Sequence, residues 1–391
     1  MQKIAIISTH PIQYNAPFFR LLCQRKNILI KVFYTWSQSE QGLKFDPGFG
    51  KEIAWDIPLL EGYDYCFVNN ISTYPGSHQF RGIDNPTLIS EIENWCANAI
   101  LVYGWSFKSH FKAMRYFKGK VPVLFRGDST LLDKQTFIKK TIRRIALKFV
   151  YSKIDIALYA GNANKAYFLA NGVVEHKLVF MPHAIDNERF AVSEKNITNA
   201  KEIRKKLKIP NDALVFLFAG KLEPKKQPDL LAKVFCEIEN NESHLIIAGN
   251  GVLENLLKAN FSNKFNIHFI DFQNQQTMPA LYATCDVFVL PSKGPSETWG
   301  LSINEAMAAG KPVIVSNACG AAYDLLVEGK TGFVFEKFDS KKLKEYLEYV
   351  LVNREKLKTM SIEVCKKISF YNYINDCIAI ENLFLNKCHL V

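Results

Sequence analysis

Short apolar runs alternate with stretches of helical patterning along most of the chain, which predicts strands followed by helices. In the first half, strands are expected at residues 3–8, 28–33, 99–103, 121–125, 155–159 and 178–181, with helices at 16–24 and 107–117. In the second half, strands are expected at residues 214–219, 244–248, 267–271, 287–290, 313–315 and 333–335, with helices at 228–239, 252–258, 278–284, 301–309, 321–328 and 340–352. Alternation of strand and helix is typical of a parallel sheet covered on both faces, so the two series predict two doubly wound α/β domains.

A polar segment at residues 191–210 separates the two series. It is rich in charge, has no hydrophobic run and is followed by a strongly apolar strand. We therefore expect an N-terminal domain at 1–195 and a C-terminal domain at 210–368. The tail at 369–391 contains an apolar, aromatic stretch with helical patterning, which we expect to pack back on the first domain.

The composition is that of a soluble α/β protein. At 391 residues the chain exceeds what one hydrophobic core normally covers, which agrees with two domains. Its apolar stretches stay below about 18 uncharged residues, so no membrane-spanning helix is expected. The first apolar run lacks a small-residue cleavage site and is expected to form a strand, not a signal peptide. The nine cysteines include no Cys-x-x-Cys pair, which favours reduced thiols in a cytoplasmic protein and predicts no metal site.

Positive charge is concentrated in the first half. The whole chain has a net charge of +11, and up to residue 190 there are 24 Lys or Arg against 15 Asp or Glu, a net of +9. The densest basic cluster is residues 134–153, where Phe and Ile recur at helical spacing and Lys and Arg fill the positions between them. A basic amphipathic helix can lie on an anionic membrane. The alternative is a packed helix with a solvated basic face, and the sequence leaves both open.

The most informative string is residues 291–313, PSKGPSETWGLSINEAMAAGKPV. It predicts Glu297 in a loop, a tight turn at Gly300 and Glu305 in the helix that follows. The first amides of a helix have no intrahelical partner and favour a bound anion. An anion held there, with a carboxylate on either side, suits a nucleoside diphosphate attached to a hydroxyl-rich sugar. For two glutamates alone, the alternative is a surface loop with solvated carboxylates.

Glycines and lysines follow two other strands of the second half. Gly220, Lys221 and Lys226 come after the first of these strands, where an ammonium group can meet phosphate charge. Gly249 and Gly251 follow the next strand and permit close approach of a ligand to the backbone, although such turns also use glycine for geometry alone. In open parallel sheets, ligands bind where the carboxyl ends of the strands converge, and all five residues fall there.

Five strings occur in an order that resembles the retaining glycosyltransferases of family 4. They are FAGKLEPKK, IAGNG, LYATCDVFVLPS, the string from Glu297 onward and EGKTGFVF, spread over residues 214–336. The resemblance implies the GT-B fold, in which two doubly wound parallel-sheet domains face a cleft. It also implies a nucleoside diphosphate sugar as donor, bound to the C-terminal domain, and an acceptor held mostly by the N-terminal domain.

The resemblance assigns site residues in the second half one by one. Lys226 matches a lysine that contacts the donor diphosphate, and Lys221 stands where the family usually has Arg, which keeps the charge but loses bidentate geometry. Glu297 matches the glutamate beside the transferred sugar, so Glu297, Lys226 and Lys221 are the expected catalytic residues. Glu305 matches the glutamate that accepts from the ribose hydroxyls. The remaining donor-binding positions are Gly220, Gly249, Gly251, Gly300, Leu301 and Ser302.

The N-terminal half departs from the common family pattern. His10, Gln13 and Tyr14 belong to a Thr-His-Pro-Ile-Gln-Tyr string after the first strand, similar to the opening of a subset of the family. They are expected to face the acceptor, with a hydrogen-bonded structural loop as the alternative. Arg126 takes a place where relatives often have a His that touches the sugar. It is expected to contact donor phosphate or an acidic acceptor, or to pair with Asp128.

The expected function is transfer of a hexose, with retention at the anomeric carbon, to a hydroxyl of a glycan or a lipid-linked acceptor. The resemblance implies a role in bacterial surface polysaccharide assembly, such as lipopolysaccharide or capsule, in the cytoplasm or on the inner face of the membrane. No cofactor or metal is expected, because lysines and a helix terminus can neutralise the diphosphate. The alternatives are a sugar-nucleotide epimerase on the same fold and a basic nucleic-acid-binding protein. The sequence lacks zinc-finger spacing and RNA-binding aromatic motifs, so no nucleic acid partner is expected.

Overall fold

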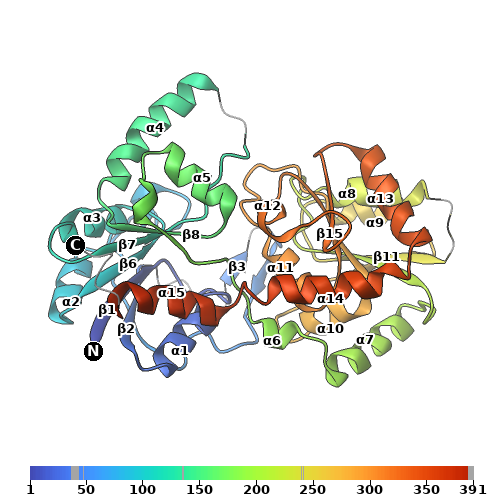
Figure 1. Cartoon of the computed structure of the whole chain (residues 1–391), viewed down its shortest axis with the longest axis horizontal. Helices are drawn as coiled ribbons and strands as arrows, with labels where there is room; N and C mark the ends of the chain where they lie inside the picture. The colour runs from blue at the N-terminus through green and yellow to red at the C-terminus, as the bar shows by residue number, and fades with distance from the viewer. Residues whose placement is uncertain (37–43, 47, 134–135, 239, 241, 386–391) are drawn as a thin grey trace. The chain divides into compact units, whose positions relative to one another are not determined.

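The computed structural model describes residues 1–36, 44–46, 48–133, 136–238, 240 and 242–385. The chain divides into two compact units (Figure 1). The first unit comprises Met1–Lys44, Ile57–Pro182 and Tyr373–Val391. The second unit comprises Phe45–Asp56 and His183–Asn372.

The first unit is built on a sheet of seven described strands in the order β5-β2-β1-β6-β7-β8-β9, in which all neighbours are parallel. Every residue from Ile4 to Ile7 in the inner strand β1 is fully buried, and since successive side chains point to opposite faces, both faces are covered. The strands are β1 (Gln2–Ser8), β2 (Ile28–Tyr34), β5 (Asp64–Phe67), β6 (Ala99–Tyr103), β7 (Val123–Arg126), β8 (Ile156–Tyr159) and β9 (Leu178–Phe180). The helices are α1 (Ala16–Gln24), η2 (Phe80–Gly82), α2 (Leu88–Asn94), α3 (Lys108–Phe117), α4 (Phe137–Tyr151), α5 (Asn162–Ala170), η3 (Glu175–Lys177) and α15 (Tyr373–Leu385).

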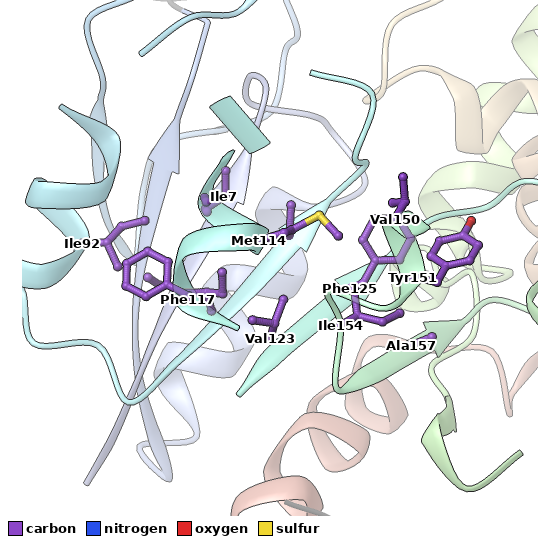
Figure 2. Packing of buried hydrophobic residues seen from close by; sticks show 14 of the residues in the cluster. Ile7, Ile92, Met114, Phe117, Val123, Phe125, Val150, Tyr151, Ile154 and Ala157 are labelled. Atoms are coloured by element: carbon purple, nitrogen blue, oxygen red, sulfur yellow. The ribbon is translucent and has the colours of Figure 1, made fainter. Parts of the chain in front are cut away.

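Large apolar side chains fill the space between this sheet and helices α2 to α5. Met114 and Phe117 of α3 and Ile92 of α2 point toward Ile7 and Val123 of the sheet (Figure 2). Farther along the same face, Phe125 of β7 packs edge-on against Phe168 of α5, with ring centroids 6.1 Å apart. Burying side chains of this size stabilises the fold by about 1.5–3 kcal/mol each.

The second unit has a sheet of six described strands in the order β12-β11-β10-β13-β14-β15, again with parallel neighbours. Its central strand β10 is buried at all six positions. The strands are β10 (Leu214–Ala219), β11 (Ser243–Ala248), β12 (Ile267–Ile270), β13 (Val287–Leu290), β14 (Val313–Ser316) and β15 (Gly332–Phe335), with β3 (Lys44–Asp46) and β4 (Lys51–Ile53) in a separate two-stranded sheet. The helices are α6 (Asn187–Phe190), α7 (Glu194–Lys206), α8 (Pro228–Cys236), α9 (Glu254–Phe261), α10 (Met278–Thr284), α11 (Leu301–Ala308), α12 (Ala322–Leu325), α13 (Ser340–Val352) and α14 (Lys356–Ile368).

Two doubly wound parallel sheets confirm the fold class predicted from the strand–helix alternation. The division between the units differs from the expected one in two places. It falls between Pro182 and His183, and the polar segment at 191–210 contains helix α7 of the second unit. In addition, Phe45–Asp56 leaves the first unit and packs within the second.

Helix α7 forms although only Ala200 of its 13 residues is buried. The Ser193 hydroxyl accepts a hydrogen bond from the amide of Asn196 at its start. Glu194 lies in the first turn and three basic residues lie in the last, which suits the helix dipole at both ends. Capping and charge therefore support a helix that hydrophobic periodicity did not predict.

Helix α15 belongs to the first unit, where it packs on α1 (Figure 1). The Arg25 guanidinium donates two hydrogen bonds of 2.7 Å to the two carboxylate oxygens of Glu381. The hydrogen bond from Arg25 holds the pKa of the Glu381 carboxyl below its usual value. Cys377, Ile380 and Leu383 of α15 are buried. The C-terminal helix is thus held by a bidentate ion pair beside an apolar contact.

Candidate functional site

Gly300 makes the turn that begins helix α11. Its φ of 95° lies in the left-handed region that favours glycine. Gly300 occupies the N-cap position and has no side chain to cap the helix, and Leu301 and Ser302 of the first turn are half-buried. The first amides of such a helix favour a negatively charged ligand. The turn, the helix and its end after Ala308 lie where the sequence predicted them, within one residue.

Lys226 and Glu297 meet beside this helix start. The Lys226 ammonium lies 2.8 Å from Oε2 of Glu297, and their side chains are only 15% and 9% exposed. Ser292, at the end of β13, donates a second hydrogen bond of 3.1 Å to the same oxygen. Burial, and then the Glu297 charge, raise the pKa of the nearby Cys319 thiol to about 12, so this sulfur stays protonated. Two of the three predicted catalytic residues therefore form one ion pair.

Lys221 forms a different ion pair. Its ammonium lies 2.7 and 3.0 Å from the two carboxylate oxygens of Asp46 and 5.1 Å from the centre of the Phe49 ring. Burial is the largest single influence and acts to raise the pKa of Asp46. The hydrogen bond and charge of Lys221, together with backbone hydrogen bonds from Gly48 and Phe49, outweigh it, so the pKa is lowered. Gly220, just before Lys221, has a φ of 152°. The structure thus pairs each lysine after β10 with its own carboxylate.

Glu305 lies in the interior of the second unit. The residue is 3% exposed, and one carboxylate oxygen accepts a hydrogen bond of 2.8 Å from the phenol of Tyr282 in α10. Glu297, by contrast, lies in the loop before α11 and bonds Lys226. The ribose contact expected of Glu305 stays a prediction, and it requires this buried carboxylate to reach a ligand.

Gly249 and Gly251 hold two strand-end loops together. Gly249 has a φ of 133°, and a Cβ there would clash with the carbonyl oxygen of Gly220. Gly251 has a φ of 153°, and a Cβ there would lie 2.7 Å from the carbonyl oxygen of Leu222. Asn250 adds a hydrogen bond of 2.9 Å from its amide nitrogen to Glu254. These glycines have a geometric role in packing the loops after β10 and β11, and the donor contacts expected of them stay predictions.

The loop that carries Glu297 is anchored by its neighbours. The amide of Gly320 donates to the carbonyl of Glu297 at 3.2 Å, and a Cβ on Gly320 would clash with the carbonyl of Thr298. The indole nitrogen of Trp299 donates to Asn304 at 2.7 Å. Asn304 in turn donates to the carbonyl of His183 at 2.8 Å. Backbone and side-chain hydrogen bonds therefore fix the loop at Glu297 and in the residues that follow it.

In the first unit, the loop after β1 is half-buried. The His10 ring nitrogen Nδ1 lies 2.9 Å from the Thr9 hydroxyl, and the ring packs edge-on against Trp36 at 5.6 Å. Gln13 and Tyr14 are also half-buried. The backbone amide of Asn15 donates a hydrogen bond of 3.0 Å to the carbonyl of Ile12, which closes the turn. These contacts fit a structural loop as well as a binding loop, so the acceptor role stays a prediction.

Arg126 is placed differently from the sequence expectation. It is 7% exposed, and its guanidinium donates to the backbone carbonyls of Met181 and Pro182, the latter at 3.0 Å. The guanidinium thus holds the segment that follows β9, while Asp128 is exposed. The expected contact with phosphate or an acidic acceptor is not what this geometry favours. The reason is that Arg126 lies at the end of a buried strand, within reach of the backbone carbonyls that follow β9. Buried carbonyls of this kind need hydrogen-bond donors.

Buried ionisable groups lie near Arg126 in the same unit. Burial raises the pKa of Asp376 in α15 to about 8, although the Arg126 charge acts to lower it. Among the described residues, its Oδ1 has no hydrogen-bond partner, which fits a protonated carboxyl. Burial also lowers the pKa of His110 to about 4, and its Nε2 lies 2.9 Å from the Thr35 hydroxyl. His110 thereby ties α3 to Thr35, the residue that follows β2.

Sequence reasoning did not identify Asp46, Ser292, Asn304 or Gly320. Ser292 and Gly320 lie in the loops that follow β13 and β14, and a position after a strand of the second unit was a usable signal. Asp46 lies 175 residues from its partner, and nothing in its local sequence indicates that contact.

Part of the chain matches a known protein family. Residues 199–366 match the family model described as glycosyl transferases group 1. The chain is 28% identical over 271 residues to UDP-Gal:alpha-D-GlcNAc-diphosphoundecaprenol alpha-1,3-galactosyltransferase of Escherichia coli, a match covering 64% of this chain and 67% of that protein. It is 29% identical over 262 residues to alpha-monoglucosyldiacylglycerol synthase of Acholeplasma laidlawii, covering 62% and 64% of the two chains.

The fold is also found in solved structures. Anabaena HepE in complex with UDP and glucose superposes with a TM-score of 0.72 at 16% identity, over 99% of this chain and 100% of that one. Together with the two parallel sheets, this similarity confirms the GT-B fold predicted from the resemblance. The family match lies within the second unit, which holds the Lys226–Glu297 pair and the start of α11. The similarity to the glycosyl transferases group 1 model therefore covers the part of the chain that holds this candidate site.

Proposed function

We propose that this protein is a retaining glycosyltransferase that moves a sugar from a nucleoside diphosphate sugar to a hydroxyl of a glycan or lipid-linked acceptor. The observation that carries this proposal is the Lys226–Glu297 ion pair beside the start of α11, where a glycine occupies the N-cap position. A cation, a helix N-terminus and a carboxylate together suit a diphosphate joined to a sugar. All three lie in the family-matched residues.

The proposed chemistry is a displacement on one face of the sugar. The acceptor oxygen forms a bond to the anomeric carbon as the bond from that carbon to the diphosphate oxygen breaks. The acceptor proton passes to the departing diphosphate oxygen, and the configuration at the anomeric carbon is retained. Lys226 and the α11 amides stabilise the growing charge on the diphosphate, and Glu297 orients the sugar through its hydroxyls. Lysines and amides supply the neutralising charge, so we propose that transfer needs neither a metal nor a cofactor.

The relatives support the choice of substrates. The name of the Escherichia coli relative gives a UDP-linked galactose donor and a diphosphoundecaprenol-linked acceptor. The name of the Acholeplasma laidlawii relative gives a glycosylated diacylglycerol. We therefore propose an acceptor that carries a lipid, and a role in bacterial surface polysaccharide assembly in the cytoplasm, on the inner face of the membrane.

Features of helix α4 support the proposal that the protein acts at a membrane. Among the residues that the structure describes, no helix combines the length and the apolar character needed to cross a bilayer, so contact would be peripheral. The buried side of α4 consists of Leu147, Val150 and Tyr151. Its other side exposes five large apolar side chains to between 55% and 83%, namely Phe137, Ile138, Ile142, Ile145 and Phe149.

The charges around these side chains favour a lipid surface over other partners. Five basic residues and no acidic residue lie within α4, so a second copy of the helix would be repelled, whereas anionic headgroups would be attracted. Exposed isoleucines suit acyl chains and are of little use to a nucleic acid. We therefore propose that α4 lies in the interface of an anionic membrane.

The proposed function is tested by a screen of donors and acceptors. UDP-, GDP- and ADP-sugars are compared for binding by calorimetry, and those that bind are offered lipid-linked GlcNAc diphosphate and diacylglycerol. We expect one nucleotide class to bind and one acceptor to be extended. Failure of every nucleotide sugar to bind would contradict the proposal.

A further inference from the structure

The segment Phe45–Asp56 comes from the first half of the sequence but packs within the second unit. At its far end, the amide of Gln276 donates to the Asp56 carboxylate at 3.1 and 3.2 Å. The side-chain amide of Asn274 donates to the carbonyl of Ala54 at 2.6 Å. These partners lie in the loop after β12, so the segment is anchored at the carboxyl edge of the sheet where donor residues converge.

Aromatic packing reinforces the anchor. The Phe49 ring meets Phe272 edge-on at 4.8 Å, and Trp55 meets the same ring at 6.2 Å. Such aromatic pairs stabilise a contact beyond simple burial. The segment therefore reaches from the loop after β12 to Lys221 after β10, across the end of β11 that lies between them in the sheet.

At Lys221, the segment supplies a carboxylate, Asp46, that is held in place for the ammonium. Asp46 binds Lys221 through both oxygens, and its Oδ1 also accepts the amide of Gly48 at 2.8 Å. A Cβ on Gly48 would lie 2.5 Å from Cδ of Lys221, so only glycine allows this approach without a shift. The carboxylate is thus fixed by its own turn as well as by the lysine.

We propose that Asp46 controls the affinity of the donor site by competing with the donor diphosphate for Lys221. This inference rests on the proposed function, in which Lys226 faces the diphosphate, and it adds that Lys221 faces the diphosphate as well. A phosphate oxygen and the Asp46 carboxylate are both anions that use the same ammonium. The Asp46–Lys221 pair must therefore loosen before a phosphate can take the lysine, and a ligand without phosphate gains nothing from this exchange.

The test is calorimetry with the full chain, using UDP, GDP and ADP, and then the matching nucleoside of whichever binds. Asp46→Asn keeps the shape of the side chain but removes its charge. Because a partly exposed ion pair is weak, we expect the nucleoside diphosphate to bind about two- to fivefold more tightly to this variant. The affinity for the nucleoside should stay unchanged.

Asp56→Asn is the matched control, since it removes the same charge from the same segment without contacting a lysine in the described contacts. It should leave the affinity for the nucleoside diphosphate unchanged. In a Lys221→Gln background, Asp46→Asn should no longer tighten binding. Equal or weaker binding by Asp46→Asn, or the same gain in Asp56→Asn, overturns the inference while leaving the proposed function standing. If no nucleotide binds the natural protein, both fall.

Discussion

The loop that carries Glu297 rests against the backbone around Gly320, and this contact leaves no room for a side chain. Family-like motifs predicted the charged residues Lys226 and Glu297, because diphosphate chemistry restricts which residue types can serve. The same motifs could not predict Asp46, because its partner Lys221 is far away in sequence. The motifs therefore named both members of the Lys226–Glu297 ion pair, whose roles toward a donor stay predictions. They did not name Asp46, because two distant segments without a shared motif supply its contact.

Gly320→Ala should distort the Glu297 loop. The added Cβ would meet the carbonyl of Thr298, so backbone must shift, at a cost of about 1–3 kcal/mol in unfolding free energy. Gly76→Ala is a control, because a Cβ there meets nothing within 4 Å. Thermal unfolding measures both variants. A Gly320→Ala variant that is as stable as the natural protein would contradict the contact between Gly320 and Thr298.

The stability of the Asp376→Asn variant, relative to that of the natural protein, should increase as the pH rises. The folded pKa of Asp376 is raised to about 8, so its contribution to stability is full below the unfolded pKa near 4 and is lost as pH rises toward 8. The amide cannot ionise and avoids this loss. The difference in Tm between variant and natural protein, measured from pH 4 to pH 8, should grow with pH. A constant difference would mean that this carboxyl is not buried as described.

Helices were predicted best where an apolar stripe recurs every three or four residues, as in α11 and α13. Helix α7 was missed because it is polar on nearly all sides and depends on its cap. Helix α4 was predicted as an element, but the sequence could not show which of its two apolar sides is buried. The structure places Leu147 and Val150 inside and leaves Ile142 and Ile145 exposed.

Removing basic charge from α4 should weaken binding to anionic vesicles. The variant replaces three basic residues of α4 by Gln, namely Lys139, Lys140 and Arg144. Each lost charge removes about 1 kcal/mol of attraction to an anionic membrane surface. The matched control replaces the exposed Lys201, Lys205 and Lys206 of α7 by Gln. Sedimentation with phosphatidylglycerol vesicles should show loss of binding for the α4 variant and retention for the α7 variant. An equal loss of vesicle binding in both variants would mean that binding depends on net charge alone, and it would contradict the role of α4.

At the scale of the whole molecule, the sequence predicted two doubly wound domains because each has its own series of strands and helices. It also predicted that the C-terminal tail packs back on the first domain, but it did not predict that Phe45–Asp56 belongs to the second unit. The second unit takes in Phe45–Asp56, and the first unit includes α15 at the far end of the chain. The exchange of Phe45–Asp56 depends on contacts between distant segments, as in the Asp46–Lys221 pair, and it leaves no periodic signal in the local sequence.

The account as a whole claims that the second unit transfers a sugar with retention and that Glu297 orients that sugar. The most direct test follows the reaction by NMR, using the donor and acceptor found in the screen, with the natural protein and Glu297→Gln. We predict a product with the anomeric configuration of the donor, and a rate at least about a hundredfold lower for the variant at unchanged nucleotide affinity. An inverted product, or full activity of Glu297→Gln, would contradict the account.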